Sequence, residues 1–254
     1  MFARDDGRVL RLYRNAAYAA EADRTIVVLR ALRDAGVRVP EVFGREDAGD
    51  RPGVVMERID GTDMLTEIGR KPWKVWGVGG LSGRAHAAMH QIEAPDILES
   101  NHDRLRRRIT ESALVPDEFR GVALARLSEM PGGDRLCHGD YHPGNLMLKA
   151  GEPVVIDWSN ASRGVPEADV VRTKLMLDYG EPPPGTPVVI RVAAKVARKL
   201  LVDSYLGAYR RAGSIDAQVM KRWELPIVVA RLTEGIPEER ERLLKQIRVL
   251  QTGA

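Results

Sequence analysis

The sequence lacks the features that mark disulfide-rich, membrane and nucleic-acid-binding proteins. Its single cysteine, Cys137, excludes a disulfide within the chain and fits a reducing compartment. No apolar run approaches the length of a membrane span, and no signal-peptide core follows Met1. No block of lysine and arginine is interleaved with aromatic residues. We therefore expect a cytoplasmic protein that binds neither a membrane nor nucleic acid.

An excess of charge of either sign is also missing. The 39 basic and 36 acidic residues leave a formal charge of +3 over 254 residues, so the overall balance favours neither a strongly cationic nor a strongly anionic partner. Cys137 lies in an apolar stretch, where a small core residue is expected rather than a reactive thiol. With 44% hydrophobic residues, the chain is long enough for one large domain or two modest ones.

The first 60 residues have the pattern of a small α+β unit. An Asp-Asp-Gly turn separates two short strands, and a helical period follows until Gly36, which is well placed to end the helix. The expected elements are strands at 2–4 and 8–13, a helix at 16–35, and strands at 42–43 and 53–59. Asp60-Gly61-Thr62-Asp63 then forms a joint and a helix start. We place a domain boundary there, giving units at 1–60 and 61–254.

The second unit is mostly helical. Apolar residues recur with a helical period in six segments, and a Pro-Pro-Pro-Gly run at 182–185 is expected to interrupt the chain. The expected helices are 73–92, 102–111, 118–130, 188–212, 216–234 and 237–250.

A polar loop follows the strand that contains Cys137. Its sequence, His138-Gly139-Asp140-Tyr141-His142-Pro143-Gly144-Asn145, has the spacing H-x-D-x-x-x-x-N. Residues 146–156 are expected to form a β-hairpin, which would bring Asn145 next to Asp157. An amide oxygen and a carboxylate placed together can ligate a hard cation such as Mg²⁺.

Asp140, on the same loop, can accept a proton from an attacking hydroxyl group. A base that orients the acceptor and a metal that neutralises phosphates are the parts needed for phosphoryl transfer. A polar turn whose Asp and Asn bond only to their own backbone is the alternative, but four matched positions around a hairpin make it a poor explanation.

These residues resemble the aminoglycoside phosphotransferase and choline kinase family, relatives of the protein kinases. The matching segments are the loop above, Val155-Ile156-Asp157-Trp158, and Gly164-Val165-Pro166-Glu167-Ala168-Asp169. The resemblance implies that Asp140 is the catalytic base, that Asn145 and Asp157 bind Mg²⁺, and that His138 and Asp169 brace the loop. It also implies a bilobal α+β fold of the protein-kinase type, with a small antiparallel N-terminal lobe and a larger, mostly helical C-terminal lobe.

The resemblance assigns nucleotide-binding residues in the small unit as well. Arg11 falls where the family has a phosphate-binding Lys or Arg, and Glu21 on the next helix would be its ion-pair partner. Met56, Glu57 and Ile59 resemble the hinge whose backbone groups bond adenine. The sequence departs from the family pattern in one respect. Kinase-like folds cover the phosphates with a glycine-bearing turn between their first two strands, and this turn is not found here because the sequence starts at what corresponds to the second strand.

The resulting hypothesis is an ATP- or GTP-dependent O-phosphotransferase that uses Mg²⁺ and acts on a hydroxyl group of a small molecule. The missing turn motivates a second hypothesis, a non-catalytic or weakly active kinase-like protein that binds a ligand. A third is a metal hydrolase built on His138, Asp140 and His142. His86 and His90 have a zinc-compatible spacing, but packing or surface histidines are expected because no Glu follows His86.

The acceptor stays open between an aminoglycoside-like antibiotic, in which case the protein would confer resistance, and another hydroxylated metabolite. Carboxylates of the C-terminal helices could bind a polycation, and aromatic or basic side chains there could line a pocket for a less cationic molecule. The carboxylate candidates are Asp203, Glu224, Glu234, Glu238 and Glu239; the others are Tyr205, Tyr209, Trp223 and Arg231. The sequence leaves the oligomeric state undecided.

Overall fold

The computed structural model describes residues 1–179 and 187–252. The Pro-Pro-Pro-Gly run at 182–185 lies outside these residues. In the described part of the chain, no helix combines the length and the apolar character needed to cross a bilayer.

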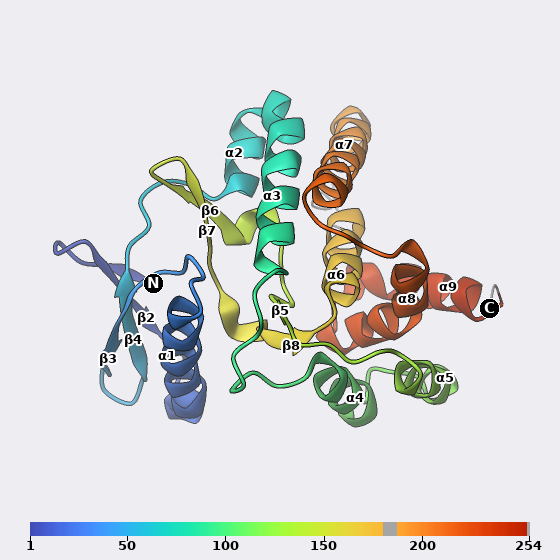
Figure 1. Ribbon diagram of the computed structural model, residues 1–254, viewed down its shortest axis with the longest axis horizontal. Coiled ribbons are helices and arrows are strands. Elements are labelled where there is room, and N and C mark those ends of the chain that lie inside the picture. Colours follow the sequence, from blue (N-terminus) through green and yellow to red (C-terminus); the bar gives the residue numbers. More distant parts are fainter. Residues whose placement is uncertain (180–186, 253–254) are drawn as a thin grey trace.

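An antiparallel sheet forms the N-terminal unit (Figure 1). Its strand order is β1-β2-β4-β3, with β1 at Phe2–Ala3, β2 at Arg8–Leu12, β3 at Val42–Arg45 and β4 at Gly53–Glu57. Gly7 closes the turn between β1 and β2 with a φ of 76°, a conformation that favours glycine. The helix α1, Ala19–Asp34, packs on the sheet through Ala22 and Ile26, which form a small apolar cluster with Tyr13, Val54 and Met56.

Helix α1 also belongs to a second apolar cluster. Val28, Leu29 and Leu32 are in the same buried cluster as Trp158 and Ala161, so α1 links the sheet of the small unit to the rest of the molecule. The N-terminal unit is also joined to the remainder by an ion pair between Glu57 and Lys149. One continuous core therefore fixes the small unit against the site described below.

The remainder of the chain is built from eight helices and four short strands among the described residues (Figure 1). The helices are α2 (Met64–Arg70), α3 (Val75–Met89), α4 (Asn101–Glu111), α5 (Asp117–Ser128), α6 (Pro166–Tyr179), α7 (Val188–Ala212), α8 (Ala217–Arg231) and α9 (Pro237–Thr252). The strands pair as β5 (Arg135–Cys137) with β8 (Ser162–Gly164) and as β6 (Leu146–Lys149) with β7 (Glu152–Val155).

Helices α3 and α7 lie side by side at unusually close range (Figure 1). A Cβ atom added to Gly79 would lie 2.7 Å from the carbonyl oxygen of Leu201, and one added to Gly83 would lie 2.2 Å from that of Tyr205. Gly79 and Gly83 are therefore packing positions of α3, where any larger residue would clash with α7.

The expected elements are largely confirmed. The small α+β unit, the hairpin at β6 and β7 and the helices at α3, α4, α5, α7, α8 and α9 form where their patterns predicted. Asp63 caps α2 by accepting the Thr66 N–H at 2.8 Å, as the helix-start signal indicated. Helix α6 and strand β8 were not foreseen, because α6 is buried over most of its surface and lacks an amphipathic period.

Candidate active site

The loop after β5 is organised by the buried ring of His138. Its Nδ1 accepts the Asp140 N–H at 3.2 Å, so Nε2 carries the proton and donates to the Ile156 carbonyl at 3.1 Å. Burial lowers the pKa of His138, which favours this neutral form. Both ring nitrogens are engaged with backbone groups. His138 therefore has no nitrogen left for a metal, and the metal-hydrolase cluster loses its first ligand.

The carboxylate of Asp169 on α6 binds the backbone of the same loop. Its Oδ2 accepts the His138 N–H at 2.6 Å and its Oδ1 accepts the Gly139 N–H at 2.9 Å. Burial acts to raise the pKa of Asp169, but hydrogen bonds from His86 and His90 outweigh it and hold that pKa well below its usual range. A buried carboxylate anion thus fixes two consecutive backbone amides.

His86 on α3 and His90, the residue directly after α3, complete this buried network. Their Nε2 atoms lie 3.1 and 3.3 Å from Asp169 Oδ2, and their Nδ1 atoms lie 2.7 and 2.6 Å from the hydroxyls of Tyr205 and Tyr209 on α7. The donor atoms of His86, His90 and Asp169 are all within 4.8 Å of one another, a spacing that a metal ion could use. The groups instead satisfy each other's hydrogen bonds, and the expected packing role of the histidines fits this arrangement.

The carboxylate of Asp140 is partly exposed to solvent, with 29% of its side chain accessible. Its Oδ1 lies 3.6 Å from Nη2 of Arg172, and its Oδ2 lies 4.0 Å from Nε2 of His142. Arg172 is itself held by a hydrogen bond from Nε to the Gly139 carbonyl and by an ion pair to Glu234 at 2.8 Å. The carboxylate is accessible to a ligand and is oriented by a fixed guanidinium.

Asn145 and Asp157 are brought together by the hairpin. The strand register pairs Leu146 with Val155, and the Ile156 N–H donates to the Asn145 carbonyl at 3.0 Å. The Asn145 amide nitrogen donates to the Asp140 carbonyl at 2.9 Å, which leaves its Oδ1 as the free ligand atom. Asp157 has a φ of 59°. Residues other than glycine rarely adopt this left-handed conformation, and those that do are concentrated at active and ligand-binding sites.

The carboxyl group of Asp157 is held in its ionised form, which can bind a cation. Burial acts to raise its pKa, but hydrogen bonds from Ser159 and Arg11 and the positive charge of Arg11 hold the pKa below its usual value. An ionised carboxylate and an amide oxygen, one at each end of the same hairpin, are donors that suit a hard divalent cation, so the residues present fit Mg²⁺.

The nucleotide-side residues are distributed around this centre. Arg11 extends from β2 and places Nη1 3.4 Å from Asp157 Oδ1. Within the described residues, no hydrogen bond or ion pair joins Arg11 to Glu21, so the pairing expected between them stays a prediction. Glu21 instead lies near Trp158 and Ser159 on the wall of a small cavity.

The three residues expected to form the adenine-binding hinge differ in whether their backbone N–H groups are already hydrogen-bonded. Met56 lies inside β4, paired with both neighbouring strands. The Glu57 N–H donates to the Glu41 carbonyl at 2.7 Å. Among the described backbone bonds, none uses the N–H of Ile59, which makes Ile59 the position of the three with a donor available to a base.

Burial excludes the three aromatic side chains that were candidates for the acceptor pocket. Tyr205, Tyr209 and Trp223 are at most 1% exposed and belong to the core, so they cannot line an open pocket. Arg231 binds Glu239 with two hydrogen bonds of 2.8 Å, and Glu234 is ion-paired with Arg231, Arg172 and Arg108. These carboxylates are neutralised by arginines and are poor sites for a polycation.

Arg172 and Glu234 are the members of the site whose roles the sequence did not reveal. Arg172 is three residues after Asp169, so both lie on one face of a helix. That spacing is the signal that identifies Arg172 once α6 is known.

Comparison with known proteins identifies the family to which the sequence is similar. A family model described as "Phosphotransferase enzyme family" matches residues 1–214. A search of curated proteins found no match to the sequence. Several solved structures share the fold at low sequence identity. The amicoumacin kinase hAmiN is 14% identical with a TM-score of 0.61, and the match covers 97% of this chain and 82% of that one.

Two further structures show the same fold. An aminoglycoside phosphotransferase, APH(3'')-Id from Streptomyces rimosus, is 16% identical with a TM-score of 0.57 and coverage of 90% and 88%. A choline kinase from Cryptosporidium parvum is 12% identical with a TM-score of 0.58 and coverage of 97% and 82%.

Proposed function

The chain belongs to the phosphotransferase enzyme family, and we propose that it transfers the terminal phosphoryl group of ATP or GTP to a hydroxyl group of a small molecule in a Mg²⁺-dependent reaction. The observation that carries this proposal is the convergence of three groups: the half-exposed carboxylate of Asp140, the Asn145 amide bonded to the Asp140 carbonyl at 2.9 Å, and the ionised Asp157.

In this proposal Asp140 orients the acceptor hydroxyl and accepts its proton as the oxygen attacks phosphorus. Arg172 keeps the Asp140 carboxylate in place, and its ion pair with Glu234 keeps the guanidinium itself from turning away. Asp169 fixes the His138 and Gly139 amides, so the loop does not have to reorganise during the reaction.

Asn145 and Asp157 would hold Mg²⁺, which when bound would neutralise charge on the phosphates. Arg11, across from Asp157, is placed to bind phosphate oxygens, and Glu21 is proposed to support it in the nucleotide complex. Met56, Glu57 and Ile59 form the adenine side, with the Ile59 N–H as the donor. The small unit at 1–60 would thus hold the nucleotide and the unit at 61–254 the acceptor.

Two of the structurally similar proteins support nucleotide binding, and one of them also supports a divalent cation. The amicoumacin kinase is in complex with AMP-PNP, Ca²⁺ and Ami, and the Streptomyces rimosus enzyme is in complex with ADP and streptomycin. A hydroxylated metabolite or an antibiotic is the corresponding acceptor class here, and action on an antibiotic would give the protein a role in resistance. The arginine-neutralised carboxylates near Asp140 favour an acceptor that is not a polycation.

Phosphoryl transfer to a panel of hydroxylated acceptors, with ATP or GTP and Mg²⁺, tests the proposal in the wild type and in Asp140→Asn and Asp157→Ala. Transfer by the wild type that is lost in both variants supports it. Undiminished transfer in both variants would contradict the roles proposed for Asp140 and Asp157. Nucleotide binding without transfer to any acceptor would favour the non-catalytic alternative.

A further inference from the structure

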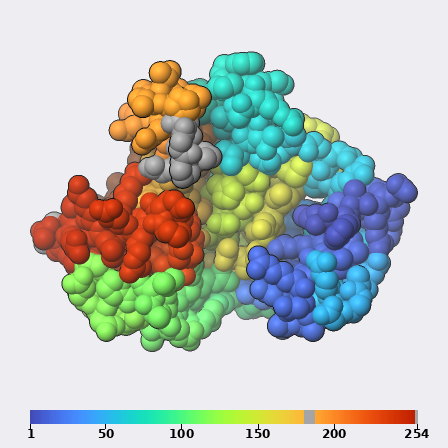
Figure 2. Space-filling model, turned by 180° about the vertical axis from the view of Figure 1, so that it is seen from behind, coloured from blue at the N-terminus to red at the C-terminus, as the bar shows by residue number. Residues whose placement is uncertain are grey.

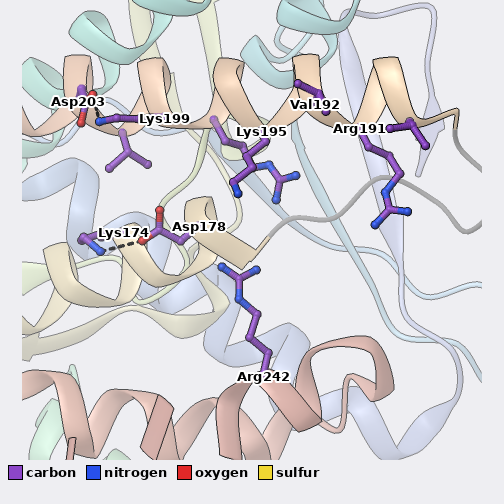
Figure 3. Close-up of a pocket in the computed structure, with 11 residues that line it drawn as sticks. Lys174, Asp178, Arg191, Val192, Lys195, Lys199, Asp203 and Arg242 are labelled. Atoms are coloured by element: carbon purple, nitrogen blue, oxygen red, sulfur yellow. Dashed lines mark hydrogen bonds and ion pairs between the residues drawn. The ribbon is translucent and has the colours of Figure 1, made fainter. Parts of the chain in front are cut away.

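A large cavity lies between α6, α7 and α9 (Figure 3). Its volume is about 920 Å³, within the range of sites that hold metabolite-sized ligands. None of the residues assigned above to the base, the metal or the nucleotide lines it, and of the candidate acceptor residues only Asp203 does, in an ion pair with Lys199. The residues proposed to carry out phosphoryl transfer therefore do not explain this cavity.

The lining of this cavity is strongly cationic. Two of its lysines are neutralised on their own helices, since Lys174 pairs with Asp178 and Lys199 with Asp203, each at 2.7 Å. Among the described residues, the lining cations are Lys174, Arg191, Lys195, Arg198, Lys199 and Arg242, and the lining carboxylates are Asp178 and Asp203. Arg242 has interactions of its own, so the cations of the described lining that no carboxylate neutralises are those of α7: Arg191, Lys195 and Arg198.

The cations on α7 form one stripe. Arg191, Lys195 and Lys199 follow each other at four-residue intervals, so they occupy a single face of the helix. Lys199 is paired with Asp203, the next position of the stripe. Arg191 and Lys195 have no such acidic neighbour on this face, and like charges at this spacing destabilise a helix. The buried residues of α7 begin only at Leu201, so the half of the helix that carries Arg191 and Lys195 is mostly exposed. The repulsion between Arg191 and Lys195 acts at the cavity that both side chains line, where an anion would relieve it.

The cations also approach the cavity from opposite walls. In Figure 3, Arg191 and Lys195 extend from α7 while Arg242 extends from α9 toward them. The guanidinium of Arg242 lies 4.1 Å from the centre of the Tyr179 ring, a contact that holds it in place. Val188, Val192 and Val202 supply apolar surface between the charges. Charges on facing walls with apolar surface between them suit a compact ligand rather than an extended polymer.

We propose that this cavity binds a small molecule that carries at least two negative charges on phosphate or carboxylate groups. Guanidinium and ammonium groups bind both kinds of oxygen anion by charge-assisted hydrogen bonds. Because the proposal concerns binding alone, it stands or falls independently of phosphoryl transfer.

Calorimetric titration of the full chain with pyrophosphate, and separately with citrate, tests it at low ionic strength without nucleotide or divalent cation. The decisive variant is Lys195→Glu, since residue 195 is exposed and its replacement removes no core contact. The matched control is Lys221→Glu, the same charge change on an exposed position of α8 outside the cavity. Arg11→Ala controls for binding of the probe at the nucleotide site.

The expected result is that Lys195→Glu weakens binding of at least one probe by about tenfold or more, while both controls stay within about twofold of the wild type. Pyrophosphate alone would identify a phosphate ligand and citrate alone a carboxylate ligand. Absence of binding to either probe would overturn the proposal, as would binding lost in Arg11→Ala but kept in Lys195→Glu. Binding of a DNA duplex with neither small probe bound would also contradict it.

Discussion

The buried carboxylate of Asp169 accepts the backbone N–H of His138 at 2.6 Å, which ties helix α6 to the loop that carries Asp140. The same carboxylate lies 3.1 Å from His86 Nε2 and 3.3 Å from His90 Nε2, so one side chain joins α6 and the loop to the end of α3. The position of Asp140 therefore depends on a group that does not take part in the chemistry.

Asp169→Asn should lower the free energy of unfolding by about 3 kcal/mol. The amide turns one acceptor into a donor that faces N–H groups, leaving buried partners unsatisfied. Urea denaturation measures the loss. Asp178→Asn on the same helix is the matched control, and its half-exposed pair with Lys174 should be worth less than about 1 kcal/mol. Equal losses in the two variants would contradict the role given to Asp169.

Acid should destabilise the protein through His86. Burial, with help from His90, lowers the pKa of His86 to about 3, whereas the unfolded chain titrates near 6.5. Between these two pH values the unfolded state binds more protons, so stability is present above about pH 6.5 and falls as the pH drops, by at most about 1.4 kcal/mol per unit for this proton.

Urea midpoints measured at pH 7 and pH 5 check this pH dependence. His86→Phe keeps a ring against Tyr141, whose ring centre lies 3.9 Å away, and it cannot take up the proton. This variant should show a smaller loss of stability between the two pH values. An identical slope in wild type and variant would show that other groups cause the acid sensitivity.

Arg172 should act by positioning. Arg172→Lys loses the planar geometry that contacts the Gly139 carbonyl, Asp140 and Glu234 together, so kcat should fall about tenfold or more. The KM for the nucleotide should stay unchanged, because Arg172 contacts no predicted nucleotide residue. Steady-state kinetics with varied ATP separate the two constants. A raised KM with an unchanged kcat would be incompatible with positioning of Asp140.

The nucleotide side is tested through Arg11. Arg11→Ala should raise the KM for ATP by about tenfold, since it removes a charged contact to phosphate. Arg11→Lys should recover part of the loss. Arg14→Ala, an exposed arginine a few residues along the chain, is the control. If Arg11→Ala and Arg14→Ala behave alike, Arg11 has no phosphate-binding role.

Local patterns explain what the sequence could predict. The signal at 146–156 was sufficient to predict the hairpin, whose register pairs Leu146 with Val155, because a hairpin determines its own register. The shared metal site of Asn145 and Asp157 stays a prediction. Helix ends were predicted where a cap was present, as at Asp63. These features depend on residues close together in the chain.

The remaining features depend on contacts between distant segments. His86 and His90 meet Asp169, Tyr205 and Tyr209 only because glycines let α3 approach α7, and no periodicity encodes that packing. The same contacts buried Tyr205 and Tyr209, which had been candidates for an acceptor pocket. The cationic cavity was likewise hidden, because the near-neutral total charge averages over a surface whose cations gather in one place.

The central claim is that Asp140 acts on the acceptor and not on the nucleotide. The most direct measurement compares kcat and the Kd for Mg-ATP in the wild type and in Asp140→Asn. The account predicts that kcat falls by about 10²- to 10⁴-fold while the Kd stays within about twofold, because the amide cannot take the proton but leaves the nucleotide contacts in place. An unchanged kcat in Asp140→Asn would contradict it.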